Sequence, residues 1–381
     1  MDKKIRMILR ATFGLGSLGL IVPFAFAEQI VLIGSVGPLT GNIAHLGKDA
    51  ENGALLAIEE ANAKGVTIGG QVITLQLDAQ DDAADPRTAT QVAQKLVDDK
   101  VVAVVGHVNS GTSIPASRIY NDAGVVEISP SATNPAYTLQ GFKSTYRVVA
   151  TDAQQGPALA NYAVKTLKLK SVAVVDDSTA YGEGFANEFE KTAKALGLNI
   201  ISHDASSDKA VDFRAILTKI KGENPDAIVY GGVDGAGGAL VKQARQLGIK
   251  AKIFGGDGMC TEMLAQLAGD AVENVVCSQP SVALEKMPGG AAFQARYVKR
   301  FGQPIQTYAP YAYDAVNVII DAMKRADSTS PQQILTAMPM TDYKGVIGTV
   351  SFDSKGDLRH GAVSIFNYVA GKKSLLSEVR L

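Results

Sequence analysis

The chain contains 381 residues, with 37 Lys and Arg against 38 Asp and Glu, so its formal net charge at pH 7 is −1. The first 27 residues carry four of the basic and one of the acidic side chains, which leaves 33 minus 37, or −4, for the rest. This slight negative charge argues against nucleic acid or an anionic membrane as a partner. A chain of this length usually folds as two domains with separate cores.

The first 27 residues have the pattern of a secretory signal peptide. Four basic residues accompany an apolar run from Ala11 to Val22, and Ala25-Phe26-Ala27 fits the small-x-small rule for cleavage. We therefore expect cleavage after Ala27 and export to a periplasm-like space. A membrane anchor is the weaker alternative, because the apolar run is short and interrupted by glycines.

Cys260 and Cys277 are the only cysteines. In an exported protein an even pair favours one disulfide, which here would contribute on the order of 3 kcal/mol through loop entropy. Two buried free thiols are the alternative.

Strands and helices alternate along most of the chain. Short β-branched runs predict strands at residues 29–36, 72–78, 101–105, 124–128, 146–150, 171–175, 199–202, 227–230 and 252–255, with two later ones near 349–352 and 363–368. Apolar spacing and capping residues predict helices at 47–63, 86–98, 109–121, 152–167, 183–196, 212–221, 239–247, 291–301, 308–325 and 331–338, with Asp152 as the cap of the fourth.

This alternation occurs twice, which implies two similar α/β lobes with parallel sheets and right-handed crossovers. The late helices and strands are too few for a third domain, so we expect them to complete the two lobes. The first lobe would comprise residues 28–151 plus 280–363, and the second would comprise residues 152–279 plus 364–381.

An acidic turn spans Asp81 to Pro86. Its clustered carboxylates suggest calcium, but their spacing is not that of an EF-hand loop. Asp85-Pro86 has the pattern of a helix N-cap followed by proline at the first helical position, and we favour that interpretation.

The stretch from Val101 to Pro135 has the pattern of a strand, a polar turn, a helix, a second strand and a second polar turn. Its two turns, Asn109–Ser113 and Ser129–Thr133, would lie at the carboxyl ends of neighbouring parallel strands, where open α/β sheets bind ligands. The helix N-terminus between them can hold a carboxylate through backbone N–H groups and the helix dipole. The alternative is that Ser110 and Ser131 only cap helices.

The sequence lacks the residues that an enzyme would need. The four histidines are scattered without metal-ligand spacing, and neither a G-x-S-x-G motif nor a P-loop is present. The glycine-rich run Gly231–Gly238, which we expect to be a turn, does not match G-x-G-x-x-G. We therefore expect no cofactor, no metal and no catalysis.

The remaining strand-end groups suit a small zwitterion. Hydroxyl and amide donors come from Asn109, Ser110, Ser131 and Thr133, while Asp257 supplies a carboxylate between glycines with no base nearby. An α-ammonium group would give that carboxylate a charge-assisted hydrogen bond. The alternative is that Asp257 is only a turn residue.

Seven motifs make the mature chain resemble the periplasmic leucine/isoleucine/valine-binding protein family, the receptors of branched-chain amino-acid ABC importers. The motifs are Gly37–Gly41, Val105–Ser110, Ile114–Ser117, Ile128–Pro135, Asp152–Gly156, Tyr181–Gly184 and Tyr230–Gly232. The resemblance implies the type I binding-protein fold, in which two doubly wound α/β lobes are joined by three crossover segments and the ligand binds in the cleft.

The resemblance also implies roles for individual residues. Ser110 and Thr133, with nearby backbone amides, would bind the α-carboxylate of an amino acid. The Ser131 carbonyl, the Thr133 hydroxyl and Asp257 would meet its ammonium group, and Tyr181 would close over the ligand. The expected ligand-binding residues are Asn109, Ser110, Ser131, Ala132, Thr133, Tyr181 and Asp257, and the expected pocket wall is Leu46, Val108, Val233, Asp234 and Tyr308.

The chain departs from the family pattern at several positions. Asp257 stands where relatives often carry the longer Glu, Val233 where some carry Tyr, and Leu46 where an aromatic residue is frequent. Relatives also carry a disulfide whose positions match Ala84 and Asn109 here, so a Cys260–Cys277 bridge would be a different one.

The sequence therefore predicts an exported, monomeric binding protein that captures an aliphatic amino acid and delivers it to a membrane ABC permease by hinge closure. A receptor of the same fold for another small carboxylate, an amide or an aromatic acid is the first alternative. A periplasmic enzyme is the second.

Overall fold

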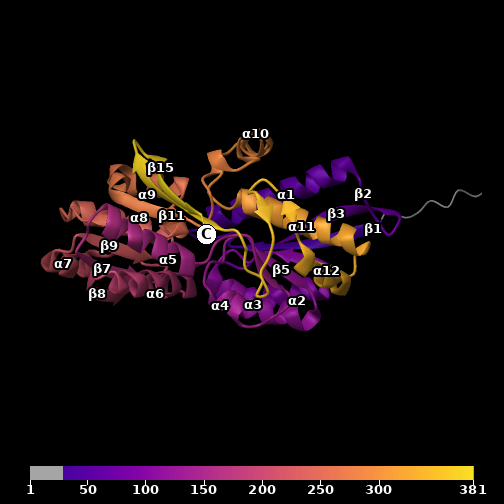
Figure 1. Cartoon of the computed structure of the whole chain (residues 1–381), viewed down its shortest axis with the longest axis horizontal. Coiled ribbons are helices and arrows are strands. Elements are labelled where there is room, and N and C mark those ends of the chain that lie inside the picture. Colours follow the sequence, from indigo (N-terminus) through magenta and orange to yellow (C-terminus); the bar gives the residue numbers. More distant parts are fainter. Residues whose placement is uncertain (1–28, 381) are drawn as a thin grey trace, which may run out of the picture.

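Two sheets organise the molecule, and each lies at the centre of one lobe (Figure 1). The structure is a computed structural model that describes residues 29–380, so the predicted signal peptide lies outside the described residues. The type I binding-protein architecture is confirmed, because the chain passes between the lobes three times, near residues 148–151, 280–289 and 351–361. The exact predicted lobe boundaries stay a prediction.

The first lobe surrounds a six-stranded sheet in the order β2-β3-β1-β4-β5-β6, in which only β2 is antiparallel to its neighbour. Its early elements are β1 (Gln29–Gly37), α1 (Ala44–Lys64), β2 (Val66–Ile68), β3 (Gln71–Asp81), α2 (Pro86–Asp98), β4 (Ala103–Val105), α3 (Ser110–Ala123), β5 (Val126–Ser129), α4 (Ala136–Leu139) and β6 (Thr145–Arg147). Later segments return to it: α10 (Gly290–Phe301), α11 (Ala309–Ala326), α12 (Pro331–Ala337) and the small pair β12 (Tyr343–Lys344) and β13 (Thr349–Val350).

The second lobe surrounds a seven-stranded sheet in the order β15-β14-β11-β10-β9-β7-β8, with antiparallel strands β14 and β15 at one edge. Its elements are α5 (Asp152–Asn161), a π-helical turn (Tyr162–Thr166), β7 (Ser171–Asp176), α6 (Ala180–Ala195), β8 (Asn199–Ala205), α7 (Arg214–Glu223), β9 (Ala227–Gly231), α8 (Asp234–Gln246), β10 (Lys252–Gly255), η2 (Asp257–Met259), α9 (Glu262–Ala268), η3 (Gly269–Asn274), β11 (Val275–Gln279), β14 (Ala362–Val369) and β15 (Lys372–Arg380).

The central strands form the cores of the lobes. Every residue of β4, β5, β9 and β11 is buried, as expected for strands covered by helices on both faces. The late helix α11 packs on α1 of the first lobe, whereas the late strands β14 and β15 join the second sheet, so the last part of the chain adds to both lobes (Figure 1).

The end of β4 is shaped by a close backbone approach. Gly106 has a φ of 143°, and a Cβ atom there would lie 2.5 Å from the Val36 carbonyl oxygen. Only glycine fits this conformation and spacing. The chain can therefore turn sharply from β4 into α3 and place the α3 N-terminus at the carboxyl edge of the sheet.

Two local predictions are wrong. The glycine-rich run is not a turn, because α8 already begins at Asp234. Its glycines serve close packing instead, since a Cβ at Gly237 would lie 2.1 Å from the Met259 sulfur. The cap of α5 is Thr151 rather than Asp152, because the Thr151 hydroxyl and the Gln154 side chain form a capping box.

Strands β2, β11, β12 and β15 were not predicted from the sequence. The acidic turn, by contrast, behaves as expected: Asp85 caps α2 by accepting hydrogen bonds from the backbone N–H groups of Arg87 and Thr88.

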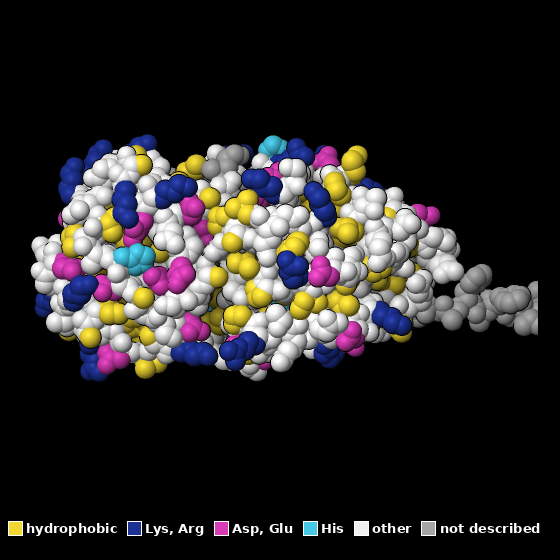
Figure 2. Space-filling view, turned by 90° about the horizontal axis from the view of Figure 1, so that it is seen from below, with side chains coloured by type: hydrophobic (Ala, Val, Ile, Leu, Met, Phe, Trp, Pro, Cys, Tyr) yellow, Lys and Arg dark blue, Asp and Glu magenta, His cyan; other side chains and the backbone are white. Residues whose placement is uncertain are grey.

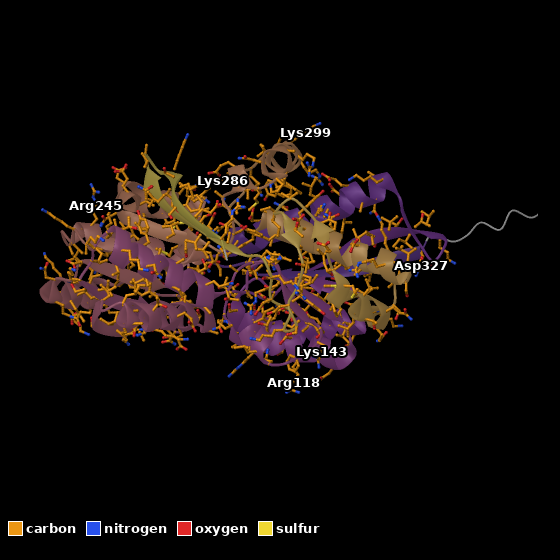
Figure 3. All side chains as sticks on the ribbon, in the orientation of Figure 1. Arg118, Lys143, Arg245, Lys286, Lys299 and Asp327 are labelled. Carbon is orange, nitrogen blue, oxygen red and sulfur yellow. A yellow bond between two sulfur atoms is a disulfide. The ribbon has the colours of Figure 1, made fainter. Side chains whose placement is uncertain are left out.

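The surface carries solvated charges of both signs. They are interspersed over the face shown in Figure 2. Figure 3 shows Arg118, Arg245 and Lys299 projecting from the outer surface of the lobes, and all three residues are exposed. Within residues 29–380, no helix combines the length and apolar character needed to cross a bilayer.

The predicted disulfide is confirmed. Cys260, just after η2, and Cys277, in β11, are bridged with their Cα atoms 5.3 Å apart, and both are fully buried. The bridge therefore fixes the segment that follows Asp257 to the central part of the second sheet.

Removing this bridge should destabilise the second lobe. Replacing both Cys260 and Cys277 with Ala should lower the free energy of unfolding by about 3 kcal/mol, because a loop constraint on the unfolded chain is lost. Guanidinium unfolding followed by circular dichroism would measure the change. An unaltered unfolding midpoint would contradict it.

Candidate functional site

The two hydroxyl-bearing turns lie next to each other at the carboxyl edge of the first sheet. The Ser131 hydroxyl donates to the Val108 carbonyl oxygen at 2.7 Å, and the Ser129 hydroxyl donates to the His107 carbonyl oxygen at 2.7 Å. The Ser129 oxygen also accepts from the Ala132 backbone N–H at 2.8 Å. These bonds fix the turn after β5 against the turn after β4.

Neither predicted serine caps a helix through its hydroxyl. Asn109 is the N-cap of α3 but forms no side-chain capping bond, and the Ser110 hydroxyl accepts from the Asn134 backbone N–H at 3.2 Å. Ser131 lies outside any helix. The capping alternative is therefore wrong for both serines, which link the two turns instead.

Two polar atoms of this edge have no hydrogen-bond partner among the described residues. They are the Thr133 hydroxyl oxygen and Asn109 Oδ1, both shielded from solvent. Because a buried polar group without a partner costs roughly 1–3 kcal/mol, these atoms are suited to a bound polar molecule. They lie beside the N-terminus of the 14-residue helix α3, where the helix dipole favours an anion.

Arg147 also stabilises the carboxyl edge of the first sheet, and this role was not predicted from the sequence. Its guanidinium is fully buried and donates to the carbonyl oxygens of Ala132 and Asn134, while its Nε pairs with Asp357 at 2.6 Å. The positive charge of Arg147 is therefore used to hold the turn rather than to face the cleft.

Asp257 lies at the start of η2, directly after β10, and is 1% exposed. Its Oδ1 accepts from Gln155 Nε2 at 2.8 Å and from the Tyr181 hydroxyl at 3.1 Å, and its Oδ2 accepts from the Tyr308 hydroxyl at 2.7 Å. Within residues 29–380 no Lys, Arg or His pairs with this carboxylate. Burial raises the pKa of Asp257, and the three donors oppose that increase.

The donors around Asp257 are themselves held in place. Gln155 accepts from the Ser278 hydroxyl at 2.9 Å, which orients its amide toward the carboxylate. The Tyr181 hydroxyl also accepts from the Gly258 backbone N–H at 3.0 Å. Gln155 belongs to the predicted motif Asp152–Gly156, but its contact with Asp257 could not be read from spacing.

The third donor, Tyr308, comes from the first lobe. Asp49 in α1 accepts from the backbone N–H groups of Thr307, Tyr308 and Ala309 at 2.6–3.0 Å, so the segment before α11 is firmly placed. The bond between Tyr308 and Asp257 therefore links a rigid segment of one lobe to the acid of the other.

The five residues of the predicted pocket wall are all buried: three are aliphatic, one is Tyr308 and one is Asp234. Leu46, Val108 and Val233 are 1%, 4% and 7% exposed and belong, with Tyr308, to one hydrophobic cluster that spans both lobes. Asp234 differs, because its carboxylate accepts from His45 Nε2 at 2.7 Å across the cleft and from the Thr261 hydroxyl. Asp234 therefore forms a contact between the two lobes and does not present an apolar surface to the cleft.

A cavity of about 410 Å³ lies between the lobes. Ile43, Asn109 and Gly111 line it from the first lobe, and Tyr181 and Val233 line it from the second. Ala84 also lines it, so both positions that match the relatives' disulfide border this cavity. No group of three or more His, Cys, Asp or Glu suited to a metal was found in the described part of the chain.

Asp152, the first residue of α5, contacts Thr133 through its backbone and interacts electrostatically with Asp257. It is fully buried, and neither carboxylate oxygen has a hydrogen-bond partner among the described residues. Burial and then the negative charge of Asp257 raise the pKa of Asp152 well above its ordinary value. The Asp152 backbone N–H donates to the Thr133 carbonyl oxygen at 2.8 Å, so the first residue of α5 lies against the turn after β5.

The sequence matches the family described as "Periplasmic binding protein" over residues 31–372. With this match across most of its length, the chain belongs to that family.

Relatives and a solved structure agree with this assignment. The chain is 37% identical to Leu/Ile/Val-binding protein homolog 1 of Brucella abortus, covering 87% of this chain and 88% of the relative. It is 32% identical to the leucine-, isoleucine-, valine-, threonine- and alanine-binding protein of Pseudomonas aeruginosa, covering 96% and 97%. The branched-chain amino-acid transporter substrate-binding protein LivJ of Streptococcus pneumoniae, solved in complex with isoleucine, superposes with a TM-score of 0.84 at 30% identity, covering 93% and 99%.

Asp152 should make the stability of the ligand-free protein depend on pH. Because its pKa in the folded state lies above the value of about 3.8 expected when unfolded, the folded state holds the proton more tightly. The free energy of unfolding should therefore fall as the pH rises above about 3.8. Asp152→Asn cannot ionise, so this variant should lose less stability over the same pH range. Thermal melts of both proteins from about pH 4 to about pH 7 would measure it, and parallel melting curves across that range would contradict the assignment.

Proposed function

We propose that this protein captures an aliphatic, branched-chain amino acid in the interlobe cleft and delivers it to a membrane ABC permease. The observation that carries the proposal is the Asp257 carboxylate, which is buried beside the cleft with hydroxyl and amide donors but no cationic partner among the described residues. The names of the relatives support the ligand class, since those proteins are described as binding leucine, isoleucine and valine.

Asp257 has room for one further donor. A carboxylate offers about four lone-pair positions, and the three donors occupy three of them. An α-ammonium group would take the fourth and supply the missing positive charge through a charge-assisted hydrogen bond. A ligand without an amine would leave the carboxylate buried without a cation.

The opposite end of the amino acid would meet the first lobe. Ser110, the Thr133 hydroxyl and the α3 N-terminus would receive the α-carboxylate, with the Ala132 segment held in place by Arg147 and Ser129. The Ser131 carbonyl would accept from the ammonium, because the Ser131 hydroxyl is already used to bind Val108. Leu46, Val108 and Val233 would contact the side chain.

The ligand would stabilise the closed arrangement of the lobes. Several hydrogen bonds already join the lobes, among them Tyr308 to Asp257, His45 to Asp234 and Asn134 to the Ala180 carbonyl. A ligand that contacts Thr133 in one lobe and Asp257 in the other adds contacts only in the closed form. The closed form would then be the state that the permease recognises.

The remaining parts of the proposal follow from the family and the leader. We propose that residues 1–27 direct export to the periplasm, that the mature protein acts as a monomer, and that it returns its ligand chemically unchanged.

Identifying the natural ligand tests the proposal directly. Small molecules released by denaturing the native protein should include a branched-chain amino acid by mass spectrometry, and calorimetry should show that leucine, isoleucine or valine binds. Ligand recovered after prolonged incubation should have its original mass. Tighter binding of an amine-free aromatic acid, or a converted product, would favour the other receptor class or an enzyme.

Removing the acid should abolish most of the binding without unfolding the protein. Asp257→Ala, and the shape-matched Asp257→Asn, should weaken amino-acid binding by about 2–5 kcal/mol, because the ammonium would be buried without its counter-charge. Asp226→Asn is the control, since that exposed carboxylate caps the start of β7 at the opposite edge of the same sheet. Calorimetry showing native affinity in both Asp257 variants, with unchanged melting curves, would reject the role.

A further inference from the structure

The interlobe cavity extends beyond the groups that would hold an amino-acid backbone. One end is bordered by Asn109, Tyr181 and Val233, next to Ser110 and the Tyr181–Asp257 contact. The other end is bordered by the loop after β7, at Asp177 to Ala180, and by the loop after β8, at Ser207 to Lys209. The same cavity therefore borders residues next to the expected amino-acid site and a group of polar residues in the second lobe, here called the polar end.

Asp177 is the distinctive residue of this polar end. It is 2% exposed, and its Oδ2 has no hydrogen-bond partner among the described residues. Burial raises the pKa of Asp177 to about 6, so the carboxylate is still ionised in most molecules near neutral pH. A buried ionised oxygen without a partner is costly, and a ligand donor would compensate for it.

The hydrogen bonds of the surrounding turn involve the other carboxylate oxygen of Asp177, Oδ1. Its Oδ1 accepts from the Thr179 backbone N–H at 3.0 Å and from the Thr179 hydroxyl at 2.6 Å. These bonds shape the turn into α6, and a Cβ at Gly182 would approach the same oxygen to 2.2 Å. The structural role therefore accounts for Oδ1 and leaves Oδ2 unexplained.

The charges around this end favour a cation over an anion. Asp208 also lines it, and Asp85 borders the cavity from the first lobe, although the Asp85 carboxylate is occupied in capping α2. Lys209 is the one basic residue in this lining, and it is exposed. Asp177 is the buried charge, so its sign should dominate for a ligand enclosed by both lobes.

We propose that Asp177 forms a second subsite of the cleft, which binds a hydrogen-bond-donating nitrogen at the far end of the ligand. Resting on the proposed amino-acid function, this subsite extends the ligand range to α-amino acids whose side chain ends in an ammonium or amide group. The aliphatic part of such a side chain would lie along Val233, and its terminal nitrogen would donate to Asp177 Oδ2.

Matched pairs of ligands test the subsite by calorimetry. L-lysine should bind the native protein about tenfold more tightly than L-norleucine, which has the same carbon chain without the amine. L-glutamine should likewise bind more tightly than L-glutamate, whose distal carboxylate would face Asp177. Asp177→Asn keeps the shape and the turn, and it should abolish the lysine preference while leaving the affinity for norleucine unchanged.

Asp176→Asn is the matched control, because this neighbouring carboxylate pairs with His203 and does not line the cavity. It should retain the lysine preference. Lysine binding no tighter than norleucine, an equal preference in Asp177→Asn, or tighter binding of glutamate than of glutamine would overturn the subsite while leaving the proposed function in place. Failure of leucine and norleucine to bind at all would overturn both.

Discussion

The arrangement of the cleft depends on a buried carboxylate, Asp257, that has no cationic partner among residues 29–380. Asp257 is ionisable, almost fully buried and surrounded by neutral donors that come from both lobes. Burying such a charge costs free energy that hydrogen bonds recover only in part. The surrounding structure keeps it in place through the Cys260–Cys277 bridge on one side and the Gln155–Ser278 contact on the other. The cost is retained because a positively charged ligand group would remove it.

The first lobe contributes a complementary edge built almost entirely from backbone groups and hydroxyls. Ser129 and Ser131 hold two turns together, Arg147 holds the carbonyl side of one of them, and Gly106 allows the sharp entry into α3. A site of this kind binds an anion without presenting a cationic side chain to the ligand. Under the proposed function, the two lobes would divide the recognition of a dipolar molecule between them, which would couple binding to closure.

Much of this could be predicted from the sequence because it depends on local patterns. Alternating apolar runs gave the α/β lobes, and polar residues after buried strands located Ser110, Thr133 and Asp257. Contacts between distant segments could not be predicted in this way. Nothing local to Gln155 or Tyr308 shows that both side chains converge on Asp257, and the role of Arg147 depends on Asp357 far along the chain. The glycines of α8 were misread because their reason is the close approach of Met259, which is a tertiary contact.

The last strand of the chain also touches the cleft region. Lys373 in β15 donates to the carbonyl oxygen of Cys260 in its own lobe at 3.2 Å and to that of Gln306 in the other lobe at 3.4 Å. Burial lowers the pKa of Lys373, as expected for an amine enclosed by protein. Lys373 therefore connects the last strand of the second lobe with the segment before α11 in the first lobe. Under the proposed function, a fluorophore attached after β15 would report on the distance between the lobes and hence on ligand binding.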